Sequence, residues 1–165
     1  MGYHGSKVSI FAEGKMNIDL RGKTAIVTGG DGAIGTAICE RFAQTGCNVI
    51  IVGIDVEKGQ KLASELSQKY SIKSSQIYGD VTDKDSMIEM SKKAIADYGR
   101  IDFLINNAGI NVGNDRRKPI NEFAESDWKG IINVDLNGVF YCSRPIIDHM
   151  IQMGGGRIVN ISSIV

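Results

Sequence analysis

Short apolar runs alternate with longer amphipathic stretches along most of the chain. The runs are rich in β-branched residues and have the length of strands, whereas the stretches between them repeat their apolar positions with the period of a helix. This alternation predicts a parallel sheet, because parallel neighbours need a crossover helix between them. We expect strands at residues 24–28, 48–52, 75–78, 101–106 and 157–161, and helices at residues 33–45, 56–70, 83–98 and 126–153.

Several of the expected strands are apolar at successive positions rather than at every second one. Residues 25–27 and 49–52 show this most clearly. Unbroken apolar runs are typical of strands that are buried on both faces, so helices should cover both sides of the sheet. Such sheets bind ligands beyond the carboxyl ends of their strands, where the strand order reverses. We therefore expect functional residues directly after the strands.

Local sequence also sets expected boundaries. Thr82 and Asp85 have the spacing of a capping box, which would open the helix that follows them. Residues 126–153 are expected to form one long helix. Residues 1–18 show no sustained periodicity, which indicates a flexible leader before a domain at residues 19–165.

The composition narrows the class of protein. With 42% hydrophobic residues, a chain of 165 residues is long enough to bury one sizeable core. Its 19 basic residues balance 19 acidic ones without any block of like charge, which argues against nucleic acid or an anionic membrane surface as a partner. No apolar run approaches the ~20 residues that span a bilayer.

The cysteines and histidines argue for a cytoplasmic protein without a metal site. Cys39, Cys47 and Cys142 are odd in number and widely spaced, which suits reduced thiols. His4 and His149 do not combine with these cysteines at the spacing of zinc ligands. We expect neither a disulfide framework nor a bound metal.

Four glycines lie between residues 29 and 35, at the turn from the first strand to the first helix. Glycines there allow a close backbone approach, so free N–H groups and the positive end of the helix dipole can face a pyrophosphate. A plain strand-to-helix turn is the alternative, but such a turn does not need so many glycines. The cluster therefore favours a phosphate-binding turn.

A second signal, Asn106-Asn107-Ala108-Gly109, follows the fourth expected strand. Together with the turn Thr28-Gly29-Gly30-Asp31-Gly32-Ala33-Ile34-Gly35, it resembles the short-chain dehydrogenase/reductase family. The marks of that family are a TGxxxGxG turn, an NNAG stretch, a serine after the fifth strand and then a YxxxK pair. The resemblance runs from about Leu20 to the last residue. It implies an α/β fold, a Rossmann-type doubly wound parallel sheet with its first five strands in the order 3-2-1-4-5. It also implies hydride transfer between NAD or NADP and an alcohol or ketone.

The resemblance implies cofactor-binding residues after each of the first four strands. They are Thr28, Gly29, Gly30, Asp31, Ala33, Ile34, Gly35, Asp55, Asp80, Val81, Asn107, Ala108 and Gly109. One position departs from the family pattern, since the middle glycine of the turn is Ala33. Its methyl group is expected to be tolerated at a modest cost.

The choice between NAD and NADP depends on the end of the second strand, where a carboxylate accepts hydrogen bonds from the ribose 2′-OH and repels a 2′-phosphate. The acidic position of the family falls on Gly53, and neither Gly32 nor Ile54 is basic as in NADP enzymes. Asp55 is the nearest charge, which favours NAD. The alternative is that Asp55 only caps the helix that begins at Val56.

The family implies a catalytic set of Ser, Tyr, Lys and Asn. The serine falls on Ser163, and the asparagine falls on Asp135. The charge of Asp135 should weaken the proton relay unless a main-chain carbonyl at a helix irregularity carries that role. The tyrosine, a general acid or base, and its lysine would follow beyond Val165. We therefore expect a C-terminally incomplete domain that does not turn over; the alternative is a non-catalytic dinucleotide-binding fragment.

The loop after the NNAG stretch contains Arg116 and Arg117, a pair that resembles family members acting on sugar acids such as gluconate. A guanidinium can hold a carboxylate through two hydrogen bonds, which suits an acid substrate. The alternative is a solvated surface loop. We also expect the fifth strand to be an exposed edge, and a full-length form to be a homodimer or homotetramer.

Overall fold

The helices and strands follow the expected alternation. The strands are β1 (Thr24–Thr28), β2 (Asn48–Gly53), β3 (Ser74–Tyr78), β4 (Phe103–Asn106) and β5 (Arg157–Asn160). The helices are α1 (Ala33–Gln44), α2 (Val56–Tyr70), α3 (Lys84–Tyr98), a 3-10 turn η1 (Asn114–Arg116), α4 (Glu125–Ile131), a π-helix η2 (Ile132–Asn137) and α5 (Gly138–Gln152). Apart from the region after β4, the boundaries differ from the expected ones by one or two residues at most.

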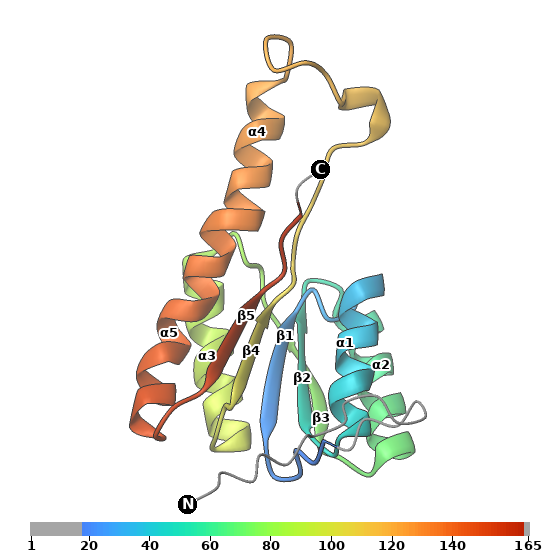
Figure 1. The fold of residues 1–165 in the computed structure, drawn as a ribbon, viewed down its shortest axis with the longest axis vertical. Coiled ribbons are helices and arrows are strands. Elements are labelled where there is room, and N and C mark those ends of the chain that lie inside the picture. Colours follow the sequence, from blue (N-terminus) through green and yellow to red (C-terminus); the bar gives the residue numbers. More distant parts are fainter. Residues whose placement is uncertain (1–17, 164–165) are drawn as a thin grey trace, which may run out of the picture.

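The strands form one parallel sheet with helices on both faces (Figure 1). The computed structural model describes residues 18–163, so the predicted leader lies outside the described residues except for Ile18. The strand order is β3-β2-β1-β4-β5, which confirms the predicted fold class and order. The order reverses between β1 and β4, and a ligand crevice is expected at that point.

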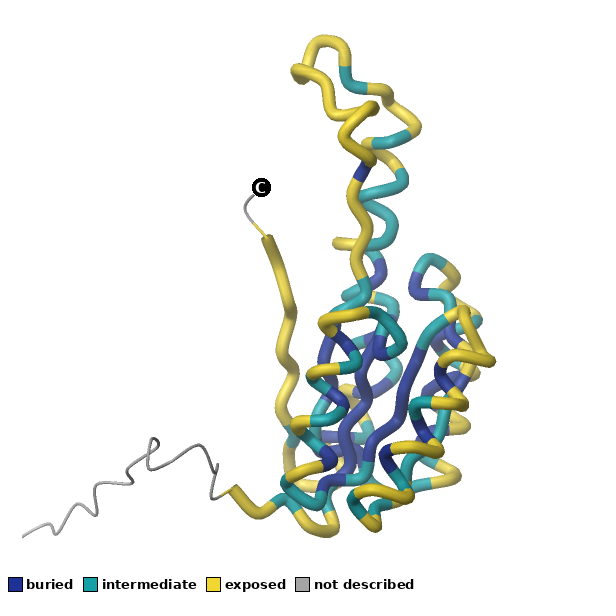
Figure 2. The backbone as a smooth tube through the Cα atoms, turned by 90° about the vertical axis from the view of Figure 1, so that its right-hand side faces the viewer, coloured by how far each residue is buried: buried dark blue, intermediate teal, exposed yellow. Residues whose placement is uncertain are grey.

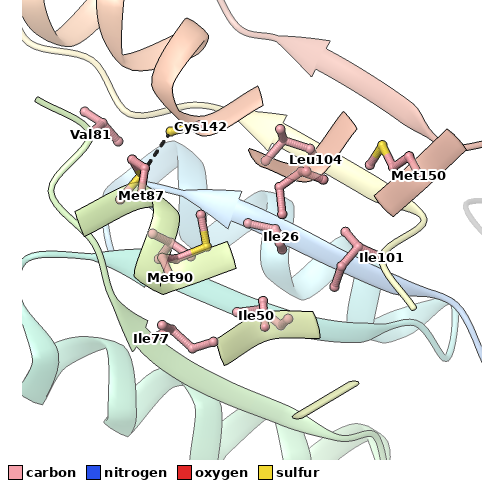
Figure 3. Close-up of a cluster of buried hydrophobic side chains, with 13 residues drawn as sticks. Ile26, Ile50, Ile77, Val81, Met87, Met90, Ile101, Leu104, Cys142 and Met150 are labelled. Atoms are coloured by element: carbon pink, nitrogen blue, oxygen red, sulfur yellow. Dashed lines mark hydrogen bonds between the residues drawn. The ribbon is translucent and has the colours of Figure 1, made fainter. Parts of the chain in front are cut away.

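Two apolar cores lie on the two faces of the sheet, because neighbouring residues of a strand point to opposite faces. Val27 of β1 is in register with Ile51 of β2 and Ile105 of β4, and these side chains pack with α1 and α2. Ile26 points to the other face, where it joins Met87 of α3 and residues of α5 (Figure 3). Burial on both faces explains the unbroken apolar runs.

The start of α3 differs from the predicted capping box. The carboxylate of Asp83 accepts hydrogen bonds from the N–H groups of Asp85 (2.9 Å) and Ser86 (3.3 Å), so Asp83 is the N-cap. Thr82 instead donates its N–H and its hydroxyl to Asp80. Thr82 is therefore part of the preceding turn, and the predicted box was wrong by one residue.

The long helix expected at residues 126–153 is interrupted. Residues Ile132–Asn137 form the π-helix η2 between α4 and α5. A π-turn holds one more residue than an α-turn and occurs frequently at functional sites. Figure 1 shows α4 and the loop before it extending past the carboxyl ends of the strands.

The fifth strand is an exposed edge, as predicted. All four residues of β5 are exposed, and Figure 2 shows the strand at the side of the sheet. Its only strand neighbour within residues 18–163 is β4. Among those residues, no helix is both long enough and apolar enough to cross a bilayer.

Asp102, a buried acid just before β4, joins β4 to the amino ends of β1 and β5. Asp102 is 5% exposed, and its carboxylate accepts hydrogen bonds from Arg100 Nε (2.6 Å) and the Thr24 N–H (3.0 Å). Lys23 lies 3.2 Å away, and the main-chain oxygen of Asp102 accepts from the N–H of Arg157 in β5. Burial raises the pKa of Asp102, but the Arg100, Thr24 and Lys23 hydrogen bonds lower it more, so the pKa lies below its ordinary value of 3.8.

We predict that Asp102→Asn lowers the free energy of unfolding by about 2 kcal/mol at pH 7, because charge-assisted hydrogen bonds to a buried group are lost. A carboxylate with a depressed folded-state pKa stabilises the protein above its unfolded pKa of ~3.9 and loses that effect as the pH falls below it. Urea titrations from pH 7 to pH 3 should therefore show the difference from wild type shrinking below about pH 4. Asp148→Asn, at an exposed residue of α5, is the control. A difference that stays constant across this range would contradict the assignment.

Candidate functional site

A cleft of about 480 Å³ opens at the carboxyl ends of β1, β2 and β4, where the strand order reverses. Its volume is in the range of small-molecule sites. It is lined by Gly29, Asp31, Gly32, Ala33, Ile34, Gly35, Gly53, Ile54, Lys58, Gly79, Asp80, Val81, Thr82, Asn107, Ala108, Gly109, Ile110 and Val134. The structure thus brings ten of the predicted cofactor-binding residues into one cleft, with Thr28 and Gly30 buried next to it.

Two glycines of the β1–α1 turn are required by its geometry. Gly29 has a φ of +58°, and a Cβ there would lie 3.0 Å from the Cα of Ala108. A Cβ on Gly35 would collide with the carbonyl oxygen of Gly29. Ala33, in contrast, is the exposed first residue of α1. The family's missing glycine is therefore at a position where a methyl group fits.

The amino end of α1 is open toward the cleft. Its N-cap, Gly32, offers no side-chain hydrogen bond, and the first turn holds no acidic residue. The first N–H groups and the positive end of the helix dipole are therefore free for an anion. Ala33, Ile34 and Gly35 carry these N–H groups and line the cleft. This arrangement suits a phosphate or pyrophosphate.

The β1–α1 turn and the NNAG stretch are joined by hydrogen bonds. The Thr28 hydroxyl accepts from the N–H groups of Asn107 (3.0 Å) and Ala108 (3.1 Å). The side-chain amide of Asn107 donates to the main-chain oxygens of Thr28 (3.0 Å) and Gly29 (3.1 Å). Because Thr28 is 1% exposed, these bonds are shielded from water. They hold two loops of the cleft in one position.

The third side of the cleft is formed after β3. The Asp80 Oδ1 accepts hydrogen bonds from the Thr82 N–H (2.9 Å) and hydroxyl (2.7 Å). Val81 is 8% exposed and belongs to the core beside α3 and α5. Both predicted residues therefore lie in the cleft wall, with the Asp80 carboxylate already engaged.

Asp55 and Asp31 have different surroundings. Asp55 is the N-cap of α2, where its carboxylate accepts from the N–H of Lys58 at 3.0 Å, and it is not among the residues that line the cleft. The structure therefore shows Asp55 as the cap of α2, which was the alternative that the sequence left open. Asp31 lines the cleft together with Gly53 and Lys58. The sequence did not lead us to expect Lys58 in the cleft. Its position in the first turn of α2, directly after β2, was the signal that could have indicated it.

The predicted catalytic residues lie outside the cleft lining. Asp135 is exposed in η2, and its Oδ1 accepts a hydrogen bond from the N–H of Ile110 at 2.9 Å. The helix irregularity considered for this residue is therefore present. Ser163 is exposed beyond the end of β5, and no hydrogen bond among the described residues joins it to Asp135.

Asn106, the first residue of the NNAG stretch, was not among the site residues that the sequence predicted. It is 3% exposed, and its Nδ2 donates to Ser143 Oγ (3.1 Å) in α5 and to Asn160 Oδ1 (2.8 Å) in β5. Its main-chain oxygen accepts from the N–H of Ile161 at 2.9 Å. Asn106 thereby holds the end of β5, from which the chain leads to Ser163.

Arg116 is the last residue of η1 and Arg117 follows it, so both belong to the loop between β4 and α4. Arg116 forms an ion pair with Asp127 of α4, with 2.6 Å between Nη1 and Oδ1. Arg117 is exposed and forms no ion pair with a described residue. Of the two guanidiniums, that of Arg117 is the one left for a ligand.

A Tyr–x–x–x–Lys spacing occurs in the chain at Tyr3 and Lys7. It precedes the glycine-rich turn, whereas the family pattern places its pair after the serine. Both residues lie outside the described residues. That the family's pair follows beyond Val165 stays a prediction.

Cys39 lies beneath the glycine-rich turn. Burial, followed by the negative charge of Asp31, raises the pKa of this thiol to about 12. Cys39 is therefore protonated at neutral pH, and it contacts the main-chain oxygen of Gly30. Its environment suits packing rather than nucleophilic chemistry.

Comparison with known proteins agrees with this geometry. A family model described as short chain dehydrogenase matches residues 23–165. The 3-oxoacyl-(acyl-carrier-protein) reductase FabG of Chlamydia muridarum is 40% identical over 150 residues, which are 91% of this chain and 59% of that protein. Gluconate 5-dehydrogenase of Gluconobacter oxydans is 37% identical over 145 residues, which are 88% of this chain and 55% of that protein.

Solved structures show the same similarity. An NAD+-bound xylitol dehydrogenase superposes with a TM-score of 0.81 at 29% identity, covering 87% of this chain and 54% of that one. A metagenomic short-chain oxidoreductase in complex with NADP gives a TM-score of 0.80 at 29% identity, covering 88% of this chain and 64% of that one. The chain therefore spans little more than half the length of most of these relatives.

We predict that Thr28→Val lowers the free energy of unfolding by about 2–3 kcal/mol, because the N–H groups of Asn107 and Ala108 lose their buried acceptor. Thr28→Ser keeps the hydroxyl and should cost less than half as much. Urea denaturation of both variants measures the difference. Equal stability of the valine and serine variants would show that the hydroxyl does not hold the two loops together.

Proposed function

Because this chain belongs to the short-chain dehydrogenase/reductase family, we propose that its cleft binds a nicotinamide dinucleotide for hydride transfer to or from an alcohol or ketone. The observation that carries the proposal is the open amino end of α1, which faces the cleft without a capping side chain or an acidic first turn. Pyrophosphate is the ligand that such a helix end and glycine turn suit best.

The residues present fit such a cofactor. Gly29 and Gly35 let the turn pack closely against Ala108 and against the start of α1, since a side chain at either would collide there. The main-chain N–H groups at the start of α1 can then face a pyrophosphate. Asp80 and Val81 would border the adenine end of the cleft, and residues 107–109 would border the other side. When bound, the nicotinamide ring supplies the hydride acceptor or donor.

Ser163 and Asp135 are the proposed catalytic contributions of this chain. Ser163 would orient the substrate oxygen through its hydroxyl. Asp135 fixes the loop after β4 through the N–H of Ile110, and a main-chain carbonyl of the π-turn around it is the group that we propose for the proton relay. The proton itself would be held by the Tyr–Lys pair that the family places after the serine.

A sugar acid is the substrate class that we propose. Arg117 carries a guanidinium without an ion-pair partner among the described residues, on a loop beyond the carboxyl ends of the strands. A guanidinium binds a carboxylate with defined geometry. The similarity to gluconate 5-dehydrogenase supports the same substrate class.

A homodimer or homotetramer is the proposed assembly. Large apolar side chains are exposed along α4, η2 and α5, namely those of Trp128, Leu136, Phe140, Ile147 and Ile151. We propose that these side chains form part of an interaction surface, because contiguous exposed apolar patches mark such sites. Two copies of the chain could cover it by symmetric contact.

We also propose a cytoplasmic location. Cys39, Cys47 and Cys142 are all buried and free. Free thiols of this kind suit a reducing compartment.

To test cofactor binding, we predict that Ile34→Glu weakens NAD+ binding at least about 10-fold, because a negative charge in the first turn of α1 would face the pyrophosphate. Ile34 is 64% exposed and lines the cleft, so the fold should tolerate the change. A glutamate near a helix amino end should leave the melting temperature unchanged or raise it. Ile34→Gln is the uncharged control for isothermal titration. Equal affinity of the two variants would contradict pyrophosphate binding at α1.

To test the substrate class, we predict that Arg117→Ala lowers kcat/KM for an aldonate about 10- to 150-fold in the protein as expressed from its gene, through loss of a charge-assisted contact. A neutral polyol should be affected far less. Lys118→Ala removes the neighbouring exposed cation and is the control. It should leave kcat/KM unchanged for both substrates. Equal losses on both substrates in Arg117→Ala, or none, would rule out carboxylate recognition by this residue.

A further inference from the structure

The carboxylate of Asp31 lies at the end of β2, although it belongs to a different part of the chain. Gly53, the last residue of β2, has no side chain, and a Cβ placed on it would lie 2.5 Å from Oδ1 and 3.0 Å from Cγ of Asp31. Asp31 reaches this place from the turn between β1 and α1. In dinucleotide-binding sheets, the acidic residue that contacts the ribose projects from the end of the second strand. The Asp31 carboxylate therefore occupies the space of that side chain.

The Asp31 carboxylate is available to a ligand. It lines the cleft, is only partly buried, and forms no ion pair with any described residue. Asp80, the other acidic residue of the cleft lining, has an oxygen occupied by two hydrogen bonds from Thr82. An ionised carboxylate can accept hydrogen bonds at both oxygens, which matches a pair of ribose hydroxyls.

The geometry of Asp55 does not suit contact with the ribose. Its carboxylate accepts the N–H of Lys58 as the N-cap of α2, and it does not line the cleft. Asp55 follows β2 directly in the sequence, whereas Asp31 belongs to the turn after β1, and of these two acids only Asp31 lines the cleft. The two residues therefore form a natural pair for a controlled comparison.

We propose that Asp31 selects NAD over NADP, by accepting hydrogen bonds from the ribose hydroxyls of the adenosine and repelling a 2′-phosphate. The inference rests on the proposed binding of a dinucleotide in this cleft. Lys58 is the one cation among the described residues that line the cleft, and it is exposed. The Asp31 carboxylate is more buried than the Lys58 ammonium, so solvent screens its interaction with a 2′-phosphate less.

Gly53 is part of the same arrangement. Because any side chain there would collide with Asp31, the carboxylate can stand over β2 only when residue 53 has none. The φ of Gly53 is not positive, so a side chain at residue 53 would be tolerated by the main chain if Asp31 were removed. The acid could then be moved from the turn back to the strand.

The test compares two probes that differ only at the 2′ position, ADP-ribose and 2′-phospho-ADP-ribose, by isothermal titration of the protein as expressed from its gene. Wild type should bind ADP-ribose at least about 10-fold more tightly, and Asp31→Asn should lose most of this preference. Asp55→Asn, the matched control, should retain it. Asp31→Gly combined with Gly53→Asp should restore it, which a merely structural role of Asp31 would not do.

Failure of the inference and failure of the proposed function give different results. An unchanged preference in Asp31→Asn, with both probes still bound, overturns the inference and leaves dinucleotide binding intact. If Asp55→Asn rather than Asp31→Asn lost the preference for ADP-ribose, the inference would also be overturned, because Asp55 would then be the residue that selects the cofactor. A folded wild-type protein that binds neither probe would contradict the proposed function itself, and the inference with it.

Discussion

The hydroxyl of Thr28 and the side-chain amide of Asn107 join the ends of two neighbouring strands, and the shape of the cleft depends on that join. Four hydrogen bonds pair main-chain groups at the carboxyl ends of β1 and β4 that the hydrogen bonds between these two strands leave free. Leaving such buried groups unpaired would cost about 1–3 kcal/mol each, so the two loops are held as one unit. Gly29 can then approach Ala108 closely enough to complete the floor of the cleft.

The NNAG loop is held at both of its ends. Asn107 fastens its first part to the β1–α1 turn, and Asp135 fastens its continuation to the π-helix through the N–H of Ile110. A ligand in the cleft would therefore meet a loop that is positioned from two sides. Fixed main-chain groups of this kind can bind a phosphate without first being ordered, which lowers the entropic cost of binding.

Much of this fold could be predicted from the apolar pattern, because burial on both faces leaves its mark at successive positions of a strand such as residues 49–52. The cleft could be predicted from the glycine turn and the NNAG stretch, which stand at the ends of adjacent strands. The cap of α3 could not, since Thr82 and Asp83 are both good capping residues and the choice depends on how Asp80 engages Thr82. The approach of Asp31 to Gly53 could not be predicted either, because it depends on side-chain direction across two loops.

The π-turn at Ile132–Asn137 has a consequence for how related chains should be compared. It adds one residue to a helix that otherwise continues from α4 into α5 in the right-handed helical region on both sides. A relative without this turn would match the chain only if a single-residue gap were opened in the middle of a helix, where gaps are normally forbidden. Alignments that refuse such a gap would shift Asp135 against its counterparts by one position, and would turn a difference in helix geometry into an apparent difference in residue type.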